Sequence, residues 1–405
     1  MANENIGFFL LLAVLFFGCD KESLRSGIDI ITINPTKAKE QINLSEFADS
    51  VSYIKIQTDS NCIMGRIREI IIKDRYIYAV DVSRQILFVF NHNGKYISKL
   101  DKRGMGPDEY NWIGAVFIDA NEQYLELHNL NGSHSSLLKY SNIDFELLDE
   151  KPMPGLSYNA CRREGCIFYF ATQQLSNIVL EERSNAGIIV MENNEIKKIL
   201  FDKVIETNNT GFSPNCECFT TNDEGEIYVS LMYDNTFYQL SRMNAIPVIS
   251  VDFGKYGIDH SIGQLSITKQ LEYIRDIDGL ASFPVLSLNN SGILAISYWF
   301  KKNSENMMFN ESDFRFFIRI KTNERTFHTK RIINDLTTFP DEVKISTYAS
   351  FIAHEVWYKD YLVDIINPAQ IMKDQGSLKI EGIGEISVFD NPIIVLMKLK
   401  EEFAN

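Results

Sequence analysis

Residues 67–100 read IREIIIKDRYIYAVDVSRQILFVFNHNGKYISKL, a pattern typical of four short β-strands. The β-type runs are Ile67–Ile72, Tyr76–Val80, Ile86–Phe90 and Lys95–Leu100. Between the last two lies Asn91-His92-Asn93-Gly94, whose Asn and Gly residues tolerate positive φ and favour a tight turn. The stretch therefore predicts one four-stranded antiparallel unit.

Similar apolar runs recur along the chain. Six of them start at residues 76, 124, 167, 227, 293 and 356, and their separations are 48, 43, 60, 66 and 63 residues. Four strands repeated every 40–50 residues or so are typical of a β-propeller blade, and the longer separations call for inserted loops. The six runs are Tyr76–Val80, Tyr124–His128, Ile167–Ala171, Ile227–Leu231, Ile293–Ser297 and Val356–Asp360.

We therefore expect an all-β fold: one six-bladed β-propeller over residues 41–400, with a short helical insertion between blades four and five. The insertion is predicted over Ser266–Asp276, where Ile267, Leu271 and Ile274 share one helical face behind a Ser cap. One blade must combine the two ends of the chain, because a closed ring leaves no open edge between its ends. Strand-like sequence is present near both ends, and either end could supply the closing strand.

The N-terminus indicates export. Gly7–Gly18 is wholly apolar, too short to span a bilayer, and fits the core of a secretory signal over residues 1–18. Gly18 precedes Cys19, as in bacterial lipoprotein signals in which that Cys is lipidated and becomes the mature N-terminus. Residues 19–40 are then expected to be the lipidated Cys and its tether. The alternative is a buried apolar element with an incidental Cys.

Composition limits the class of protein. The 405 residues are 45% hydrophobic, enough apolar side chain to bury a core, so a disordered chain is excluded. The net charge of −14 argues against a nucleic-acid partner, because phosphate neutralisation needs clustered Lys and Arg. It also disfavours polyanionic ligands in general, unless the fold assembles a local basic patch.

Three segments together resemble a known family: Val51–Ile56, Phe88–Ile97 and Arg103–Tyr110. They resemble the six-bladed β-propeller lipoproteins of Bacteroidetes, which are similar to NHL-repeat propellers in blade layout. In that family the last motif usually reads Gly-Arg/Lys-Gly-Pro-Gly-Glu-Tyr, and here Met105 and Asp108 depart from it. The resemblance implies a propeller in the cell envelope and does not imply an activity.

The same loop is the candidate ligand-binding site. An Arg and two Gly residues suit an anionic or hydroxylated ligand, two acids suit sugar hydroxyls, and two aromatic rings suit stacking. The candidate residues are Arg103, Asp108, Glu109, Tyr110 and Trp112. In the alternative interpretation, the loop is only a connection between blades and its charged groups pair locally.

The histidines do not form a metal motif. There is no His-Glu-x-x-His pattern, and no two histidines have a spacing that by itself implies a ligand pair. We therefore expect no metal and no cofactor. The six are His92, His128, His134, His260, His328 and His354.

The cysteines allow one short disulfide. Arg162-Arg163-Glu164-Gly165 suits a tight turn, so Cys161 and Cys166 could face each other across a hairpin and form a bond. The roles of Cys62, Cys216 and Cys218 stay open.

No nucleophile motif such as Gly-x-Ser-x-Gly occurs, and no catalytic carboxylate pair can be nominated from adjacency. The leading hypothesis is a monomeric, non-catalytic binding or scaffold protein of the outer membrane, held to the membrane by its lipid alone. One propeller face would contact a glycan, a peptide or an envelope protein. The alternative is a hydrolase or lyase whose active site is assembled from several blades at the central channel, which linear motifs would not reveal.

Overall fold

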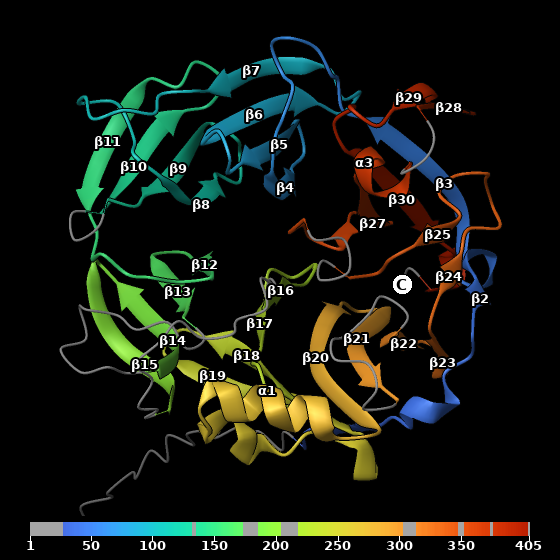
Figure 1. Ribbon diagram of the computed structural model, residues 1–405. Helices are drawn as coiled ribbons and strands as arrows, with labels where there is room; N and C mark the ends of the chain where they lie inside the picture. Colours follow the sequence, from blue (N-terminus) through green and yellow to red (C-terminus); the bar gives the residue numbers. More distant parts are fainter. Residues whose placement is uncertain are drawn as a thin grey trace, which may run out of the picture.

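A computed structural model describes residues 27–131, 135–172, 185–203, 218–302, 313–346, 352–372 and 376–403. In these ranges the chain forms a ring of β-sheets (Figure 1). No helix within them is long and apolar enough to cross a membrane. Seven sheets have three strands or more, and we number them 1 to 7 around the ring.

The strands of each sheet follow one another from the centre of the ring outward (Figure 1). Sheet 1 contains β4 (Ile67–Ile72), β5 (Tyr76–Asp81), β6 (Ile86–Asn91) and β7 (Tyr96–Leu100). Sheet 2 contains β8 (Ile113–Ile118), β9 (Tyr124–Asn129), β10 (Ser136–Ser141) and β11 (Leu147–Pro152). Sheet 3 contains β12 (Ala160–Glu164), β13 (Ile167–Ala171), β14 (Asn185–Glu192) and β15 (Glu195–Lys203). Sheet 4 contains β16 (Phe219–Thr221), β17 (Ile227–Ser230), β18 (Thr236–Ser241) and β19 (Asn244–Asp252).

The remaining sheets close the ring. Sheet 5 contains β20 (Leu280–Asn289), β21 (Ile293–Lys301), β22 (Phe314–Ile320) and β23 (Arg325–Thr329). Sheet 6 contains β25 (Glu342–Val343), β24 (Ile332–Ile333) and β2 (Ile42–Asn43), and sheet 7 contains β26 (Trp357–Tyr358), β27 (Tyr361–Ile366), β30 (Ile393–Leu399) and β3 (Ala48–Lys55). A separate hairpin pairs β28 (Ser377–Ile380) with β29 (Gly384–Ser387).

The expected count of six blades is wrong, because sheet 6 brings the number to seven. It lies between sheets 5 and 7 (Figure 1), and each of its three strands has only two residues. Strands this short carry no alternation or apolar run that a sequence pattern could reveal. The all-β class itself is what the structure shows.

The second strand of each four-stranded unit explains the recurring apolar runs. β5, β9, β13, β17 and β21 coincide with the first five runs, and they are buried along almost all of their length. A strand with neighbours in its own sheet and sheets packed on both faces needs apolar residues at every position. In the last unit the buried second strand is β27, a few residues after the predicted run at Val356–Asp360.

The N-terminal segment forms a strap along the outer edges of four consecutive sheets. β1 (Asp29–Thr32) pairs in parallel with β19 of sheet 4, and Lys39 bridges to Thr329 of sheet 5. β2 then pairs with β24 of sheet 6, and β3 pairs with β30 of sheet 7. Residues 29–40, which we expected to be tether, therefore belong to the folded ring.

Sheet 7 combines strands from the N-terminal and C-terminal parts of the chain, and the closing strand comes from the N-terminal side. β3 is the outermost strand and β30 lies between it and β27. Their antiparallel register runs from Ala48↔Leu399 to Lys55↔Ile393.

The expected helical insertion is also corrected. The segment forms a helix, α1 (Ile267–Asp276), but it belongs to the connection from β19 to β20, and the end of α1 packs with sheets 4 and 5. The buried Lys301 on β21 donates to the carbonyl of Ile274 at 2.8 Å, near the end of that helix. Besides α1, the only other α-helix among the described residues is α3 (Pro368–Ile371). The helices are thus parts of connections between strands.

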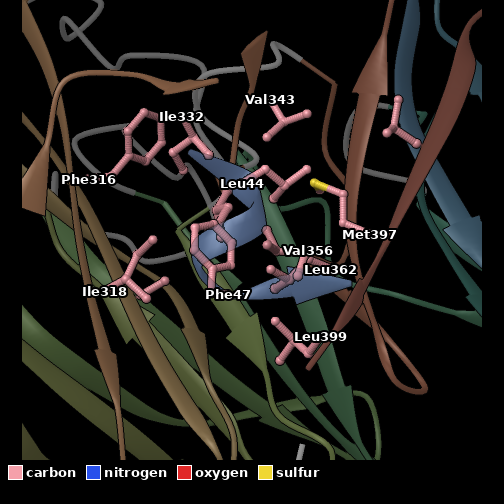
Figure 2. Close-up of a cluster of buried hydrophobic side chains, with 14 of the residues drawn as sticks. Leu44, Phe47, Phe316, Ile318, Ile332, Val343, Val356, Leu362, Met397 and Leu399 are labelled. Atoms are coloured by element: carbon pink, nitrogen blue, oxygen red, sulfur yellow. The ribbon is translucent and has the colours of Figure 1, made fainter. Parts of the chain in front are cut away.

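The largest buried cluster unites sheets 5, 6 and 7 with the strap. Figure 2 shows Leu44 and Phe47, just after β2, between side chains of all three sheets. The other labelled members are Phe316, Ile318, Ile332, Val343, Val356, Leu362, Met397 and Leu399. Sheet 6 is short, but it occupies a fully packed position in the ring.

The two faces of the ring differ. Within each four-stranded unit, neighbouring strands run in opposite directions. The loops between second and third strands therefore lie on the same face as the connections between sheets. The remaining turns, between first and second and between third and fourth strands, lie on the opposite face. In the described part of the chain, the first face carries long connections such as 101–112, 153–159 and 253–279. The opposite face carries tight turns such as 165–166, 193–194 and 242–243. We call the first the long-loop face.

Candidate functional site

The predicted ligand-binding loop, 101–112, is a connection on the long-loop face, and its acids are engaged within it. Lys102 Nζ lies 2.8 Å from Asp108 Oδ2, and this contact lowers the pKa of the Asp108 carboxyl. The backbone N–H of Gly106 donates to Glu109 Oε2 at 2.7 Å. These contacts match the alternative in which the charged groups pair locally.

Tyr110 anchors the loop to the core instead of offering a stacking surface. Its side chain is fully buried, and its hydroxyl contacts the carbonyl oxygens of Gln85 at 2.6 Å and Leu100 at 3.0 Å. Gln85 in turn accepts from the N–H of Ile113 at 2.6 Å. The buried Tyr110 side chain therefore anchors the loop to sheets 1 and 2.

Three of the predicted residues face solvent. Arg103 is exposed, and its backbone bridges to Tyr110. Trp112 is 46% exposed, immediately before β8. Asp108 is exposed as well, with 55% of its side chain accessible, although it is paired with Lys102.

A second group of charged residues lies at the centre of the ring, near the long-loop face. We call Arg68, Glu69, Arg162 and Glu355 the central cluster. Arg162, on β12, has Nη1 3.8 Å from Glu69 Oε1 and Nη2 3.7 Å from Glu355 Oε1. Residues from sheet 1, sheet 3 and the segment before sheet 7 therefore meet at one place.

Backbone pairing positions Glu355. The segment 352–355 runs beside the inner edge of β4, where Ala353 donates to the carbonyl of Arg68 at 2.8 Å and accepts from Ile70 at 2.9 Å. Arg68 itself reaches sheet 2, with Nη1 2.9 Å from the carbonyl oxygen of Ile113. The cluster is thus built on the inner strands of sheets 1 and 3 and on the segment that pairs with β4.

His128 and Tyr158 lie between sheets 2 and 3. The imidazole Nδ1 is 2.8 Å from the Tyr158 hydroxyl, and the two rings stack with centroids 5.5 Å apart. Burial lowers the pKa of His128 to about 4, so the ring is neutral at pH 7. Gly114 leaves room for the Tyr158 hydroxyl, which a Cβ at this position would meet.

The other histidines are dispersed. His328 contacts the Tyr298 hydroxyl at 2.6 Å, and His354 lies against the carbonyl oxygens of Ile352 and Val363. In the described ranges, no group of three or more His, Cys, Asp or Glu side chains is placed to hold a metal ion. His134 lies outside those ranges.

The expected disulfide between Cys161 and Cys166 is absent from the described structure. The β12–β13 register pairs Cys161 with Phe170 and Glu164 with Ile167, so Cys166 sits in the turn and does not oppose Cys161. Cys166 is an exposed free thiol 3.6 Å from Glu192 Oε1. Cys62 is a buried free thiol, and burial raises its pKa to about 11. Cys19 and Cys216 lie outside the described residues.

Sequence reasoning missed the central cluster because its members are far apart in the chain. One signal was available in retrospect: Arg68-Glu69 interrupts an otherwise apolar run, and Arg162-Arg163 directly precedes one. A charged residue in an inner strand must either pair or face the centre of the ring.

A ring of radially arranged antiparallel sheets defines a β-propeller, with loops displayed on one face and a charged cluster at the centre. The chain belongs to the family described as "Domain of unknown function (DUF4934)", whose model matches residues 28–398. None of the curated proteins matches it.

Two solved structures are similar in fold. One is described as a "Putative exported protein" of Bacteroides fragilis, with a TM-score of 0.65 and 18% identity, over 92% of this chain and 100% of that one. The other is a member of the DUF4221 family from Bacteroides vulgatus, with a TM-score of 0.50 and 9% identity, over 87% and 97% of the two chains. At these identities the similarity concerns the fold alone.

Proposed function

We propose that the chain is a non-catalytic binding or scaffold protein of the cell envelope, which presents its long-loop face to a glycan, a peptide or an envelope protein. The observation that supports this most is the difference between the two faces. Long connections on one side of a rigid ring provide a surface for recognition, while tight turns on the other provide little.

The central cluster is consistent with a binding role. Its charged groups face one another as arginine–glutamate pairs, and the candidate loop uses its acids internally. A hydrolase or lyase at the centre of the ring is the alternative, and a turnover assay on the same substrates distinguishes the two.

The proposed location is the outer membrane, with Cys19 lipidated and residues 1–18 removed as a signal. The apolar run before Cys19 supports it, as does the fold shared with a protein described as exported. A Cys19→Ser variant is expected to move from the membrane fraction to the soluble fraction. Cys166→Ser, which changes an exposed free thiol, is the matched control and should stay with the membrane.

The binding role is tested with glycan and peptide arrays probed with the Cys19→Ser chain. Saturable binding should be weakened by an Arg103→Ala, Trp112→Ala double variant on the long-loop face. Lys359→Ala, in the turn between β26 and β27 on the opposite face, should bind as before. Turnover of any array ligand, or equal effects of the two variants, would contradict the proposal.

A further inference from the structure

The charges of the central cluster balance. Two arginines and two glutamates give a formal charge of zero. Among the described residues, the contacts of Arg162 with Glu69, at 3.8 Å, and with Glu355, at 3.7 Å, are longer than a hydrogen bond. Each carboxylate has about four lone-pair sites, so Glu69 and Glu355 keep acceptor capacity.

Arg68 has donor capacity left over. Its Nη1 donates to the carbonyl of Ile113, but its Nη2 is buried and has no hydrogen-bond partner among the described residues. A buried donor left unsatisfied destabilises a fold, and native proteins rarely contain one. The position therefore favours an acceptor supplied from outside the described protein.

Solvent reaches the cluster. The side chain of Glu355 is 43% exposed, while those of Arg162 and Glu69 are 17% and 16% exposed. Trp112, whose side chain is about half exposed, directly precedes Ile113, the residue that accepts from Arg68. An accessible aromatic ring thus lies next to the strand that anchors the cluster.

These features select a class of ligand. An anion would be repelled by the two glutamates and by the net charge of −14 of the chain. A cation would be repelled by the two arginines. A hydroxyl group both accepts and donates, so neighbouring hydroxyls can satisfy an arginine N–H and a glutamate oxygen together without adding charge. Sugars carry such hydroxyls, and their apolar faces suit an aromatic ring.

We propose that the central cluster binds a neutral sugar of a glycan, with Arg68 and Arg162 donating to its hydroxyls and Glu69 and Glu355 accepting from them. This inference rests on the proposed binding function and narrows it from three ligand classes to one. The Tyr158–His128 contact beside the cluster serves as a rigid support, because both rings are stacked and bonded to each other.

The test uses the full Cys19→Ser chain on an array of neutral glycans, acidic glycans and peptides, followed by calorimetry with the strongest neutral binder. Arg162→Gln and Glu355→Gln are expected to weaken that binding at least tenfold. Arg163→Gln is the matched control, since this neighbour on β12 pairs with Glu126 instead and should change affinity less than twofold. Unfolding midpoints of all variants are measured alongside, and Glu355→Gln changes a side chain that is 43% exposed, so this variant should fold normally.

Each outcome is decisive. Neutral-glycan binding that is lost in Arg162→Gln and Glu355→Gln but kept in Arg163→Gln supports the site. Binding of peptides or acidic glycans alone overturns the sugar site but leaves the binding function standing. Equal losses in Arg162→Gln and Arg163→Gln overturn the site as well. No binding to any probe overturns the sugar site and leaves an envelope protein as the remaining ligand class of the proposed function.

Discussion

Tyr110 is one of the most deeply buried side chains in the fold. Its ring fills the core between sheets 1 and 2, while its hydroxyl contacts two buried carbonyl oxygens. An aromatic residue with a polar tip looks the same in sequence whether it faces a ligand or the core. What distinguishes the two is the depth at which the loop packs, which depends on residues far away in the chain.

Replacing Tyr110 by Phe tests this structural role. The ring should still pack, but the carbonyl oxygens lose a donor, so we expect the free energy of unfolding to fall by about 1–2 kcal/mol. Urea unfolding measures the loss. Tyr124→Phe, at a half-buried tyrosine that begins β9, is the control and should change stability by less than about 0.5 kcal/mol. Equal effects of the two changes would show that the Tyr110 hydroxyl does not anchor the loop.

Asp364 on β27 gives a second prediction for a single residue. Burial raises its pKa to about 7, although its oxygens accept from the N–H groups of Lys344 and Ile365, each at 2.8 Å. A carboxyl whose pKa is higher in the folded state than its ordinary 3.8 stabilises the fold at low pH, and this contribution is lost as the pH rises from about 4 to 7. At about 1.36 kcal/mol per pKa unit, the loss is on the order of 4 kcal/mol.

The buried His128 and His328 lower the stability of the parent chain as the pH falls from 7 to 4, and Asp364 offsets part of this loss. An Asp364→Asn variant should therefore show a steeper fall in stability over this range than the parent chain. Denaturant unfolding at half-unit pH steps measures it. Asp360→Asn, which changes an exposed carboxyl in the turn before β27, is the control and should keep the parent slope. An unchanged slope in Asp364→Asn would mean that the carboxyl titrates normally in the folded protein.

At the scale of elements, the strap along sheets 4 to 7 allows two deletions to be compared. Removing residues up to 34 deletes β1, a fifth strand on a sheet that keeps its other four. Removing residues up to 56 deletes β3 as well, which leaves β30 with an unpaired edge and opens the ring. We expect the shorter deletion to lower the melting temperature by several degrees, and the longer one to abolish a cooperative transition.

Circular dichroism with heating measures both deletions, and size-exclusion chromatography detects the aggregation expected of an open edge. A cooperative, monomeric chain without β3 would show that the strap does not close the ring.

Element by element, the sequence patterns predicted the long strands well and the short ones poorly. β4 matches its predicted run residue for residue, and β5 and β6 differ from theirs by one residue. Continuous apolar runs are diagnostic where a strand is buried on both faces. The two-residue strands of sheet 6 are held by pairing with β2 and by packing in the core cluster of Figure 2. Both are long-range effects, so no local pattern could predict a seventh sheet.

At the scale of the molecule, the same limit applies to the candidate site. The loop at 101–112 was conspicuous because its glycines, proline and charges are adjacent in sequence. The central cluster joins positions 68 and 355, which only closure of the ring brings together. In a propeller, inner strands of all blades meet at the centre, so the site is spread over the whole chain by construction.

The whole molecule should be sensitive to acid because of its buried histidines. Burial lowers the pKa of His128 and of His328 to about 4, and it also lowers the pKa of His354. A base whose pKa is lower in the folded state contributes stability that is complete above its ordinary value of 6.5 and is lost as the pH falls towards 4. As the pH falls over this range, the contribution of His128 and that of His328 to the free energy of unfolding each decrease by roughly 3 kcal/mol. The contribution of Asp364 increases by on the order of 4 kcal/mol. The sum is a net decrease in the free energy of unfolding.

We therefore expect the free energy of unfolding to fall by a few kcal/mol between pH 6.5 and 4, as measured by denaturant unfolding at constant ionic strength. A His128→Gln, His328→Gln double variant should lose less over the same range, whatever its stability at pH 7, because neither side chain can then take up a proton on unfolding. His92→Gln changes a half-buried histidine and should follow the parent curve. If the double variant and the parent lose the same amount of stability over this range, the histidines do not cause the acid sensitivity. Protonation of paired surface carboxylates such as Asp108 must then cause it.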